Sequence, residues 1–441
     1  MSRSIKKSLI ALSVSTALFA PSVFATNGFF SHGYSTKEKG LAGAGVAYST
    51  DALAVANNPA GIAGMGERLD VGAAIFSPPR SYTASGAPSN QFGPGGPTFS
   101  LGPGKVDSKS DLFLIPHFAY NWQLDNDSSV AFGMYANGGM NSNYKGGSAT
   151  TNFNGDGVTF SSLPGTYGAG TTGMDLKQLF LNLSYGTKIN ESHSVGASLI
   201  LAYQLFEARG LARFGDFGFS ESPASLTNND PEDSIGLGVK LGWQGEVSPG
   251  FTLGASYQTK MSMSELDDYA GLFAEQGGFD IPATSSLGFA WKIDKQSTLV
   301  VDVQTIFFSD VPSIGNPFSL FFAPNQFGST NGPGFGWDDM TIVKVGYEWY
   351  TGDTAYRVGI SNGSQPIASS EVLFNLLAPA VIETHLTAGF TMPLSSSSEF
   401  SLAGMYGLKN SITGPNPLDP GQTIKLEMFQ YEVQATYSMM F

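Results

Sequence analysis

The sequence contains no cysteine and few charged residues, since Asp, Glu, Lys and Arg make up 13 % of its 441 residues. Soluble domains usually contain about 25 % charged residues, so this composition favours a chain with much of its surface outside water. The lack of cysteine fits a chain that crosses an oxidising compartment unfolded. Because 36 acidic residues outnumber 22 basic ones, nucleic acid is not expected as a partner.

Residue patterns for catalysis are scarce as well. The chain has four histidines, His32, His117, His193 and His385, and no two have the His-x-x-x-His spacing of a zinc site. The glycine-rich run at 40–45 does not follow a strand pattern, as a dinucleotide fingerprint would. The sequence therefore predicts no cofactor, no metal site and no enzyme. A serine hydrolase with widely spaced triad residues is the alternative left open.

The first 25 residues predict a secretory signal peptide. Arg3, Lys6 and Lys7 precede an apolar run at 9–19, and small residues lead to a cleavage position after Ala25. A membrane anchor is the alternative, but the run is shorter than the roughly 20 residues that a spanning helix needs. No later stretch reaches 18 apolar residues, so no transmembrane helix is expected either.

From about Glu67 onward, apolar and polar residues alternate. In the segment 234–244 the odd positions are apolar, from Ile235 to Trp243, and the even positions are Ser, Gly, Lys and Gln. A period of two indicates strands with one apolar and one polar face. Such strands are typical of a soluble sandwich or of a barrel that faces lipid.

The connections between the strands favour the barrel. Alternate connections are short, at 124–128, 189–192, 248–250, 294–296, 351–353 and 393–397. The others are long and rich in Gly, Pro, Asn and Ser, at 85–107, 145–173, 211–233, 267–281 and 311–338. Short turns at one end and long loops at the other are typical of outer-membrane proteins. The sequence thus predicts an all-β fold, a transmembrane antiparallel β-barrel of about 14 strands over residues 67–441.

Residues 26–66 show no alternation and precede the first strand. They contain many small apolar residues and a short helical pattern at 51–57. A periplasmic tail would be more polar, whereas Ala and Gly permit close packing against an inner wall. We therefore predict a hatch, that is, a plug inside the barrel, with a periplasmic tail as the alternative.

Several short motifs together resemble the FadL family of outer-membrane transporters, which also includes TodX. They are Gly28-Phe29-Phe30, the Gly/Ala run at 40–45, the motif Asn58-Pro59-Ala60, the strands at 129–144 and 356–360, and the ending at Phe441. Each motif is weak alone, but they occur in order over nearly the whole chain. The final strand, with Tyr437 and the terminal Phe441, is also similar to the signal by which outer-membrane barrels are recognised for assembly. An ordinary last strand is the alternative.

The resemblance implies passive uptake of hydrophobic small molecules, either long-chain fatty acids or hydrocarbons, across the Gram-negative outer membrane. It implies that the ligand is held in an apolar pocket near the amino terminus, and the Gly-Phe-Phe start predicts that the ligand lies against Phe29 and Phe30 of the hatch. It also implies lateral release through a gap beside a kinked third strand, where this sequence reads Ala136-Asn137-Gly138-Gly139. Consecutive glycines permit such a bend. A general aqueous porin and a structural barrel remain the alternatives.

If the apolar positions of each strand face lipid, the alternate positions line the lumen. This places three cations, Lys240, Lys344 and Arg357, on the inner face of the barrel. They are candidates for binding a ligand head group, or they form salt bridges with Asp302 and Glu348. The sequence departs from the resemblance at 203–206, which reads Tyr-Gln-Leu-Phe where a basic residue is expected. That departure leaves a neutral hydrocarbon open as the ligand. The expected surroundings are outer-membrane lipid, lipopolysaccharide and the barrel assembly machinery, around a monomer.

Overall fold

The computed structural model describes residues 27–89, 98–152, 161–321 and 325–441. The signal peptide expected at 1–25 lies outside these residues. Among the helices described, none is both long enough and apolar enough to cross a membrane.

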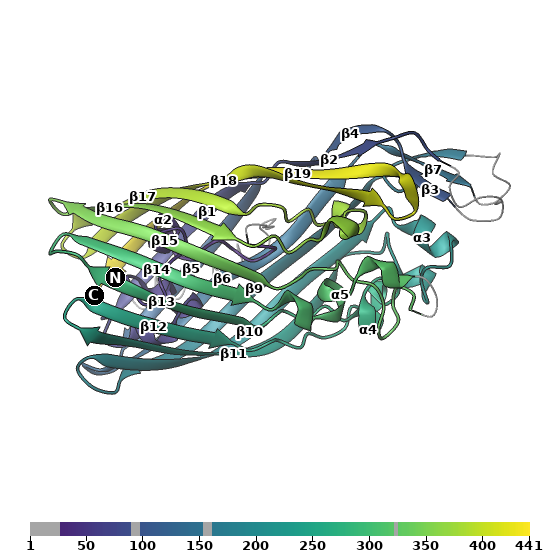
Figure 1. The fold of residues 1–441 in the computed structure, drawn as a ribbon. Helices are drawn as coiled ribbons and strands as arrows, with labels where there is room; N and C mark the ends of the chain where they lie inside the picture. Colours follow the sequence, from purple (N-terminus) through teal and green to yellow (C-terminus); the bar gives the residue numbers. More distant parts are fainter. Residues whose placement is uncertain (1–26, 90–97, 153–160, 322–324) are drawn as a thin grey trace.

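Fourteen antiparallel strands form a closed barrel (Figure 1). In chain order they are β1 (Arg68–Ser77), β5 (Phe113–Gln123), β6 (Ser128–Tyr144), β9 (Thr172–Lys188), β10 (His193–Arg209), β11 (Glu232–Ser248), β12 (Phe251–Gln258), β13 (Thr284–Lys292), β14 (Ser297–Ile306), β15 (Met340–Thr351), β16 (Thr354–Gly363), β17 (Thr384–Ser395), β18 (Ser398–Asn416) and β19 (Asp419–Met440). Pairing of β1 with β19, from Arg68 opposite Met440 to Ser77 opposite Tyr431, closes the sheet. The predicted all-β barrel is confirmed.

The alternation in the sequence sets the two faces of the wall. In β11 the side chains of Leu237 and Leu241 are more than half exposed, whereas Lys240 between them is buried. Successive side chains of a strand point to opposite faces, so apolar residues cover the outside and polar residues line the inside. Exposed tyrosines and tryptophans, such as Trp122, Tyr185 and Tyr437, belong to the aromatic girdles typical of membrane barrels.

The alternation that begins at about Glu67 does not form one continuous first strand in the structure. Pro78 and Pro79 separate β1 from β2 (Arg80–Ser85), because proline cannot donate to a strand ladder. β2 pairs with the upper part of β19 and with β4 (Gly104–Asp107). The last two strands, β18 and β19, extend to Asn416 and from Asp419.

The long connections carry small elements of their own. A separate sheet consists of β3 (Thr98–Leu101), β7 (Ser148–Asn152) and β8 (Ser161–Pro164). Short helices complete the connections: α3 (Ala212–Asp216), η3 (Pro223–Ser225), η4 (Asp267–Tyr269), α4 (Ala274–Gly277), η5 (Phe308–Asp310), α5 (Pro312–Gly315), η6 (Phe318–Phe321), η7 (Ser369–Glu371) and η8 (Phe374–Leu376). Many of their apolar side chains belong to the largest buried cluster.

Residues 27–66, the amino-terminal segment, precede the wall and form α2 (Thr36–Gly40), η1 (Ala52–Ala56) and η2 (Pro59–Ile62). Figure 1 draws this segment in purple among the strands. Hydrogen bonds or ion pairs join it to β1, β6, β9, β11, β14, β15, β16, β17, β18 and β19. The segment is therefore held by strands around most of the wall.

Candidate functional site

An aromatic cluster surrounds Phe29 and Phe30. The ring centroid of Phe29 lies 5.3 Å from that of Phe308 and 5.9 Å from that of Trp337. Phe279 stands at 6.2 Å on another side, and all of these side chains are buried. Separations of this size are typical of favourable ring contacts. Residues of the long connections thus enclose the start of the amino-terminal segment in an apolar environment.

The kink expected in the third strand is a bulge in β6 at Asn137. Pairing with β9 shifts there, because Ala136 stands opposite Leu179 and Gly138 opposite Gln178, which leaves Asn137 unpaired in the ladder. Such a bulge bends its strand. The structure brings Asn137, Gly138 and Gly139 directly against the amino-terminal segment, whereas Ala136 packs among apolar residues of the wall.

The backbone of the amino-terminal segment pairs with this bulge. The Ser31 amide donates to the Asn137 carbonyl at 2.8 Å, and the Gly139 amide donates to the Phe29 carbonyl at 2.9 Å. Gly138 forms a bridge with Phe30. A Cβ atom on Gly138 would lie 1.8 Å from the Phe29 oxygen, so only glycine permits this approach.

β5 and β6 separate just before the bulge along β6. Their ladder ends where Phe118 stands opposite Met134, and the upper part of β5 pairs with β1 alone. Further up, the Lys109 amide donates to the Asn143 carbonyl at 2.8 Å. We call the interval between these two contacts the parting; it extends over residues 110–117 on one side and 135–142 on the other. A second apolar cluster belongs to this level of the barrel and consists of Ala74, Phe76, Phe113, Ile115, Ala136 and Met405.

Two of the three candidate cations, Lys240 and Lys344, line one small cavity together with Glu38. Lys240 donates to the Ala56 carbonyl, and Lys344 donates to the Gly43 carbonyl at 3.2 Å. Burial, reinforced by repulsion from Asp51, raises the pKa of Glu38 to about 8. At neutral pH Glu38 is therefore mostly protonated.

The third cation, Arg357, has a carboxylate partner. Its Nε lies 2.6 Å from Glu348 Oε2, and its Nη1 donates to Thr391 at 2.7 Å. Asp302, which stands opposite Lys344 in the ladder, accepts the Gly45 amide at 2.7 Å instead. The salt-bridge interpretation thus describes Arg357, while Lys240 and Lys344 contact backbone carbonyls.

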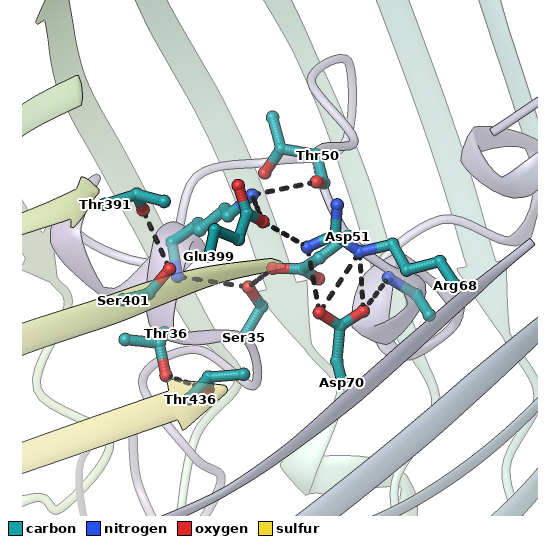
Figure 2. Close-up of polar contacts among 12 residues, drawn as sticks. Ser35, Thr36, Thr50, Asp51, Arg68, Asp70, Thr391, Glu399, Ser401 and Thr436 are labelled. Atoms are coloured by element: carbon teal, nitrogen blue, oxygen red, sulfur yellow. Dashed lines mark hydrogen bonds and ion pairs between the residues drawn. The ribbon is translucent and has the colours of Figure 1, made fainter. Parts of the chain in front are cut away.

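A buried charge network holds α2 against the wall (Figure 2). Lys37 Nζ lies 2.6 Å from Glu399, which also pairs with Arg68. Arg68 in turn contacts Asp70 at 2.8 Å, and Asp70 accepts the Ala52 amide at the same distance. Sequence analysis did not identify these contacts, since parity indicates which face a residue occupies but not its partner across the barrel.

The Asn58-Pro59-Ala60 motif attaches the amino-terminal segment to β10 and β11. The Asn58 side chain accepts the Ala60 amide at 3.0 Å, which caps η2, and donates to the Trp243 carbonyl at 2.9 Å. A Cβ on Gly242 would lie 2.0 Å from the Asn58 amide oxygen. The absence of a side chain at Gly242 therefore leaves the space that the Asn58 side chain occupies.

Ser361 of β16 lies between two histidines, His32 of the amino-terminal segment and His385 of β17. Ser361 Oγ lies 2.9 Å from His32 Nε2 and 3.4 Å from His385 Nδ1. Gly359-Ile360-Ser361-Asn362-Gly363 has the spacing of a hydrolase elbow, which sequence analysis did not single out. However, Ser361 is buried within strand β16, whereas the elbow exposes its serine at a strand-to-helix turn.

Tyr437 and Phe441 lie on the outside of the barrel, 40 % and 61 % exposed. The Phe441 amide donates to the Glu67 carbonyl at 3.0 Å, and its ring centroid lies 6.0 Å from that of Tyr120. Their role in assembly stays a prediction. Within the described residues, no group of three or more His, Cys, Asp or Glu side chains is arranged to hold a metal ion.

Comparison with solved structures shows the same fold. The toluene transporter TodX of Pseudomonas putida superimposes with a TM-score of 0.66 at 18 % identity, over 93 % of this chain and 99 % of that one. A FadL homologue of Pseudomonas aeruginosa gives 0.64 at 16 % identity, over 94 % and 100 % of the two chains. The toluene transporter TbuX of Ralstonia pickettii gives 0.59 at 17 % identity, over 93 % and 99 %.

No curated protein matches the sequence. A family model described as outer membrane protein transport protein (OMPP1/FadL/TodX) matches residues 17–392. The predicted location in the Gram-negative outer membrane is confirmed by this match together with the barrel. The chain belongs to the OMPP1/FadL/TodX family of outer-membrane transport proteins.

Proposed function

We propose that the protein carries hydrophobic small molecules, long-chain fatty acids or hydrocarbons, passively across the outer membrane. The solute enters among the long connections, is held at Phe29 and Phe30, and leaves sideways through the parting between β5 and β6. The observation that carries this proposal is the backbone pairing of Phe29–Ser31 with the β6 bulge. It joins the apolar cluster to the place where the wall ladder ends.

The aromatic surroundings of Phe29 support an apolar solute. The cluster continues from Phe279 to Phe273, 4.7 Å away between centroids, and from Trp337 to Phe335, 6.2 Å away. An apolar route from the long connections to the amino-terminal segment would exclude hydrated ions and admit rings or chains. Two of the similar structures, TodX and TbuX, are toluene transporters.

The parting supports lateral release. A solute that left through the periplasmic mouth would expose each methylene to water again, at about 0.8 kcal/mol apiece. For a dozen methylenes this amounts to roughly 10 kcal/mol, which favours an exit into the bilayer. The apolar cluster around Ala136 and Met405 would line that exit.

Lys240 and Lys344 favour a solute with an anionic end, because they share a cavity that includes Ser31 and Tyr34, directly after the two phenylalanines. Mass spectrometry of co-purified ligand would separate the two solute classes. Fatty acids bound to the native protein and lost in Lys240→Met/Lys344→Met would support the head-group role. Neutral hydrocarbons bound equally by both proteins would restrict the proposal to hydrocarbons.

The same proposal assigns parts to the chain. Residues 1–25 are a signal peptide removed on export, 26–66 are the hatch, and 67–441 are the transmembrane barrel. The barrel assembly machinery inserts it as a monomer, surrounded by outer-membrane lipid and lipopolysaccharide. The hatch assignment is supported by the contacts of the amino-terminal segment with strands on most sides of the wall.

Deletion of Asn137 tests lateral release. Removing the one unpaired residue restores a regular ladder between β6 and β9 and should straighten β6, so that uptake of a labelled fatty acid or alkane falls severalfold. Asn137→Ala keeps the bulge but loses the side-chain bonds to Tyr34 and Gln178. Deletion of Val247, the extra residue of the bulge in β11, is the second control.

Both controls should retain uptake. Normal uptake by a correctly folded Asn137 deletion would place the exit elsewhere. Large, stable ion conductance of the native protein in planar bilayers would instead indicate an aqueous pore, contrary to the proposal.

A further inference from the structure

We infer that the outer face of the β18–β19 hairpin, at Lys409, Lys425 and Glu427, binds a phosphate group of lipopolysaccharide in the outer leaflet. This inference concerns the barrel's lipid surroundings and does not depend on which solute is carried.

Two lysines share a single carboxylate at this place. Lys409 Nζ lies 2.8 Å from Glu427 Oε1, and Lys425 Nζ lies 2.9 Å from Glu427 Oε2. The lysine side chains are 59 % and 43 % exposed, and that of Glu427 is 19 % exposed. The carboxylate therefore positions two ammonium groups and neutralises only one, which leaves an oriented positive charge open to the surroundings.

These side chains point away from the barrel interior. Ile424, Leu426 and Met428, which alternate with them along β19, belong to the buried core. Lys425 and Glu427 share the outward parity of Tyr431 and Val433, since side chains two residues apart lie on the same face of a strand. The two lysines thus stand above the apolar outer surface of the same hairpin.

Their height matches the upper edge of the apolar belt. Tyr437 is an exposed aromatic residue near the end of the barrel that carries the short turns. It lies ten residues beyond Glu427 in β19. At about 3.3 Å per residue and a tilt of about 40°, this interval spans roughly 25 Å, which is the height of the apolar band of an outer-membrane barrel. Glu427 and its lysines therefore lie at the level where acyl chains end and lipid phosphates begin.

The positive face continues onto the neighbouring strands. Thr83 of β2 stands opposite Lys425 on one side and opposite Lys105 of β4 on the other. Residues directly opposite in an antiparallel pair point to the same face. Lys105 lies 3.0 Å from Asp107, and both are more than half exposed. Figure 1 shows β2 and β4 alongside the far end of β19.

Three lysines against two carboxylates give this face a net positive charge, in a chain whose formal net charge is −14. Other partly exposed ion pairs, such as Lys177 with Asp175 in β9 and Lys260 with Asp280 between β12 and β13, match one cation with one carboxylate. Lysine ammonium groups bind phosphate oxygens through charge-assisted hydrogen bonds, and basic side chains at a membrane surface attract anionic head groups. A phosphorylated lipid fits both the charge and the height.

The test measures binding of bis-phosphorylated lipid A to the full detergent-solubilised barrel by native mass spectrometry. Lys409→Gln/Lys425→Gln should weaken binding about tenfold, the combined effect expected for two exposed charge-assisted contacts. Lys260→Gln/Lys177→Gln is the matched control and should retain native affinity. Heat-modifiable migration on gels verifies that each variant is folded.

Lipid A without phosphates should bind the native protein as weakly as intact lipid A binds the Lys409/Lys425 variant. Equal affinity of the folded variant and the native protein for intact lipid A would overturn the inference. So would complete competition by inorganic phosphate at millimolar concentration, which would indicate a site for the free ion instead.

Discussion

Lys39 and Glu432 form an ion pair between α2 and β19 in which both side chains are almost fully buried. A buried charge that loses its partner is far more costly than an exposed one, because water cannot replace the lost interaction. The amino-terminal segment therefore depends on pairs of this kind for its attachment to the wall.

Glu432→Gln should weaken the attachment of the segment by about 3–5 kcal/mol, because it leaves the Lys39 ammonium buried without a carboxylate. Native-state hydrogen exchange of residues 27–66 would measure the free energy of detachment. Asp107→Asn removes a partner from an exposed pair and should cost less than about 1 kcal/mol. An effect of Glu432→Gln as small as that of this control would contradict the prediction.

Glu38 makes the attachment depend on pH. Its pKa is raised from 4.5 to about 8, chiefly by burial and then by Asp51. The attached state keeps the proton up to about pH 8, whereas the detached state loses it near pH 4.5, so attachment weakens as the pH rises between these values. Burial lowers the pKa of His32, which acts in the opposite direction below its ordinary value of 6.5.

Glu38→Gln should therefore remove the loss of attachment between pH 6.5 and pH 8. The glutamine still completes the capping box with Ser35. Limited proteolysis of the segment at several pH values would provide the measurement. The same decline with pH in both proteins would show that another group is responsible.

At the scale of elements, the joint between the amino-terminal segment and β6 depends on glycine. A Cβ at Gly138 would fall within the Phe29 carbonyl group, whereas a Cβ at Gly404 in β18 would meet its nearest atom at 3.9 Å. Gly138→Ala should release Phe29–Ser31 from β6 and remove the exchange protection of the Ser31 and Gly139 amides. Gly404→Ala should change neither, and retained protection in Gly138→Ala would refute the steric argument.

The period of two in the sequence was sufficient to predict the wall, since one face meets lipid and the other the lumen. It did not predict the break at Pro78 and Pro79, where the ladder bonds of the first strand are lost. Nor did it reveal β3, β7 and β8 within the long connections. The bulge at Asn137 was indicated by its adjacent glycines, but its backbone pairing with Phe29–Ser31 depends on contacts far apart in the chain.

The inward cations illustrate the same limit at the scale of the site. Parity identified Lys240, Lys344 and Arg357 as inward-facing, and all three are buried. Their partners follow from the three-dimensional path of residues 27–66, so that Arg357 meets Glu348 while the two lysines meet backbone carbonyls. The local sequence pattern therefore determines which face of the wall a side chain occupies, whereas contacts between distant parts of the chain determine which group it meets.

At the scale of the whole molecule, the barrel closes through its first and last strands. β1 and β19 pair along the full length of β1, so closure waits for the carboxy-terminal strand in any route that builds the wall in chain order. Outward residues at the end of that strand, Tyr437 and Phe441, contribute little to the core but remain accessible to another protein during insertion.

Phe441→Ala should therefore separate assembly from stability. Because the side chain is 61 % exposed, its removal should change the stability of the folded barrel by no more than about 0.5 kcal/mol, as measured by denaturant unfolding of refolded protein in lipid. The amount in the outer membrane of cells should nevertheless fall severalfold, if the assembly machinery recognises the terminal aromatic ring. Leu408→Ala, at an exposed position in β18, is a control that should change neither. Native membrane levels of Phe441→Ala would show that the terminal strand is an ordinary closing strand, and an equal fall in stability and membrane level would attribute the effect to folding.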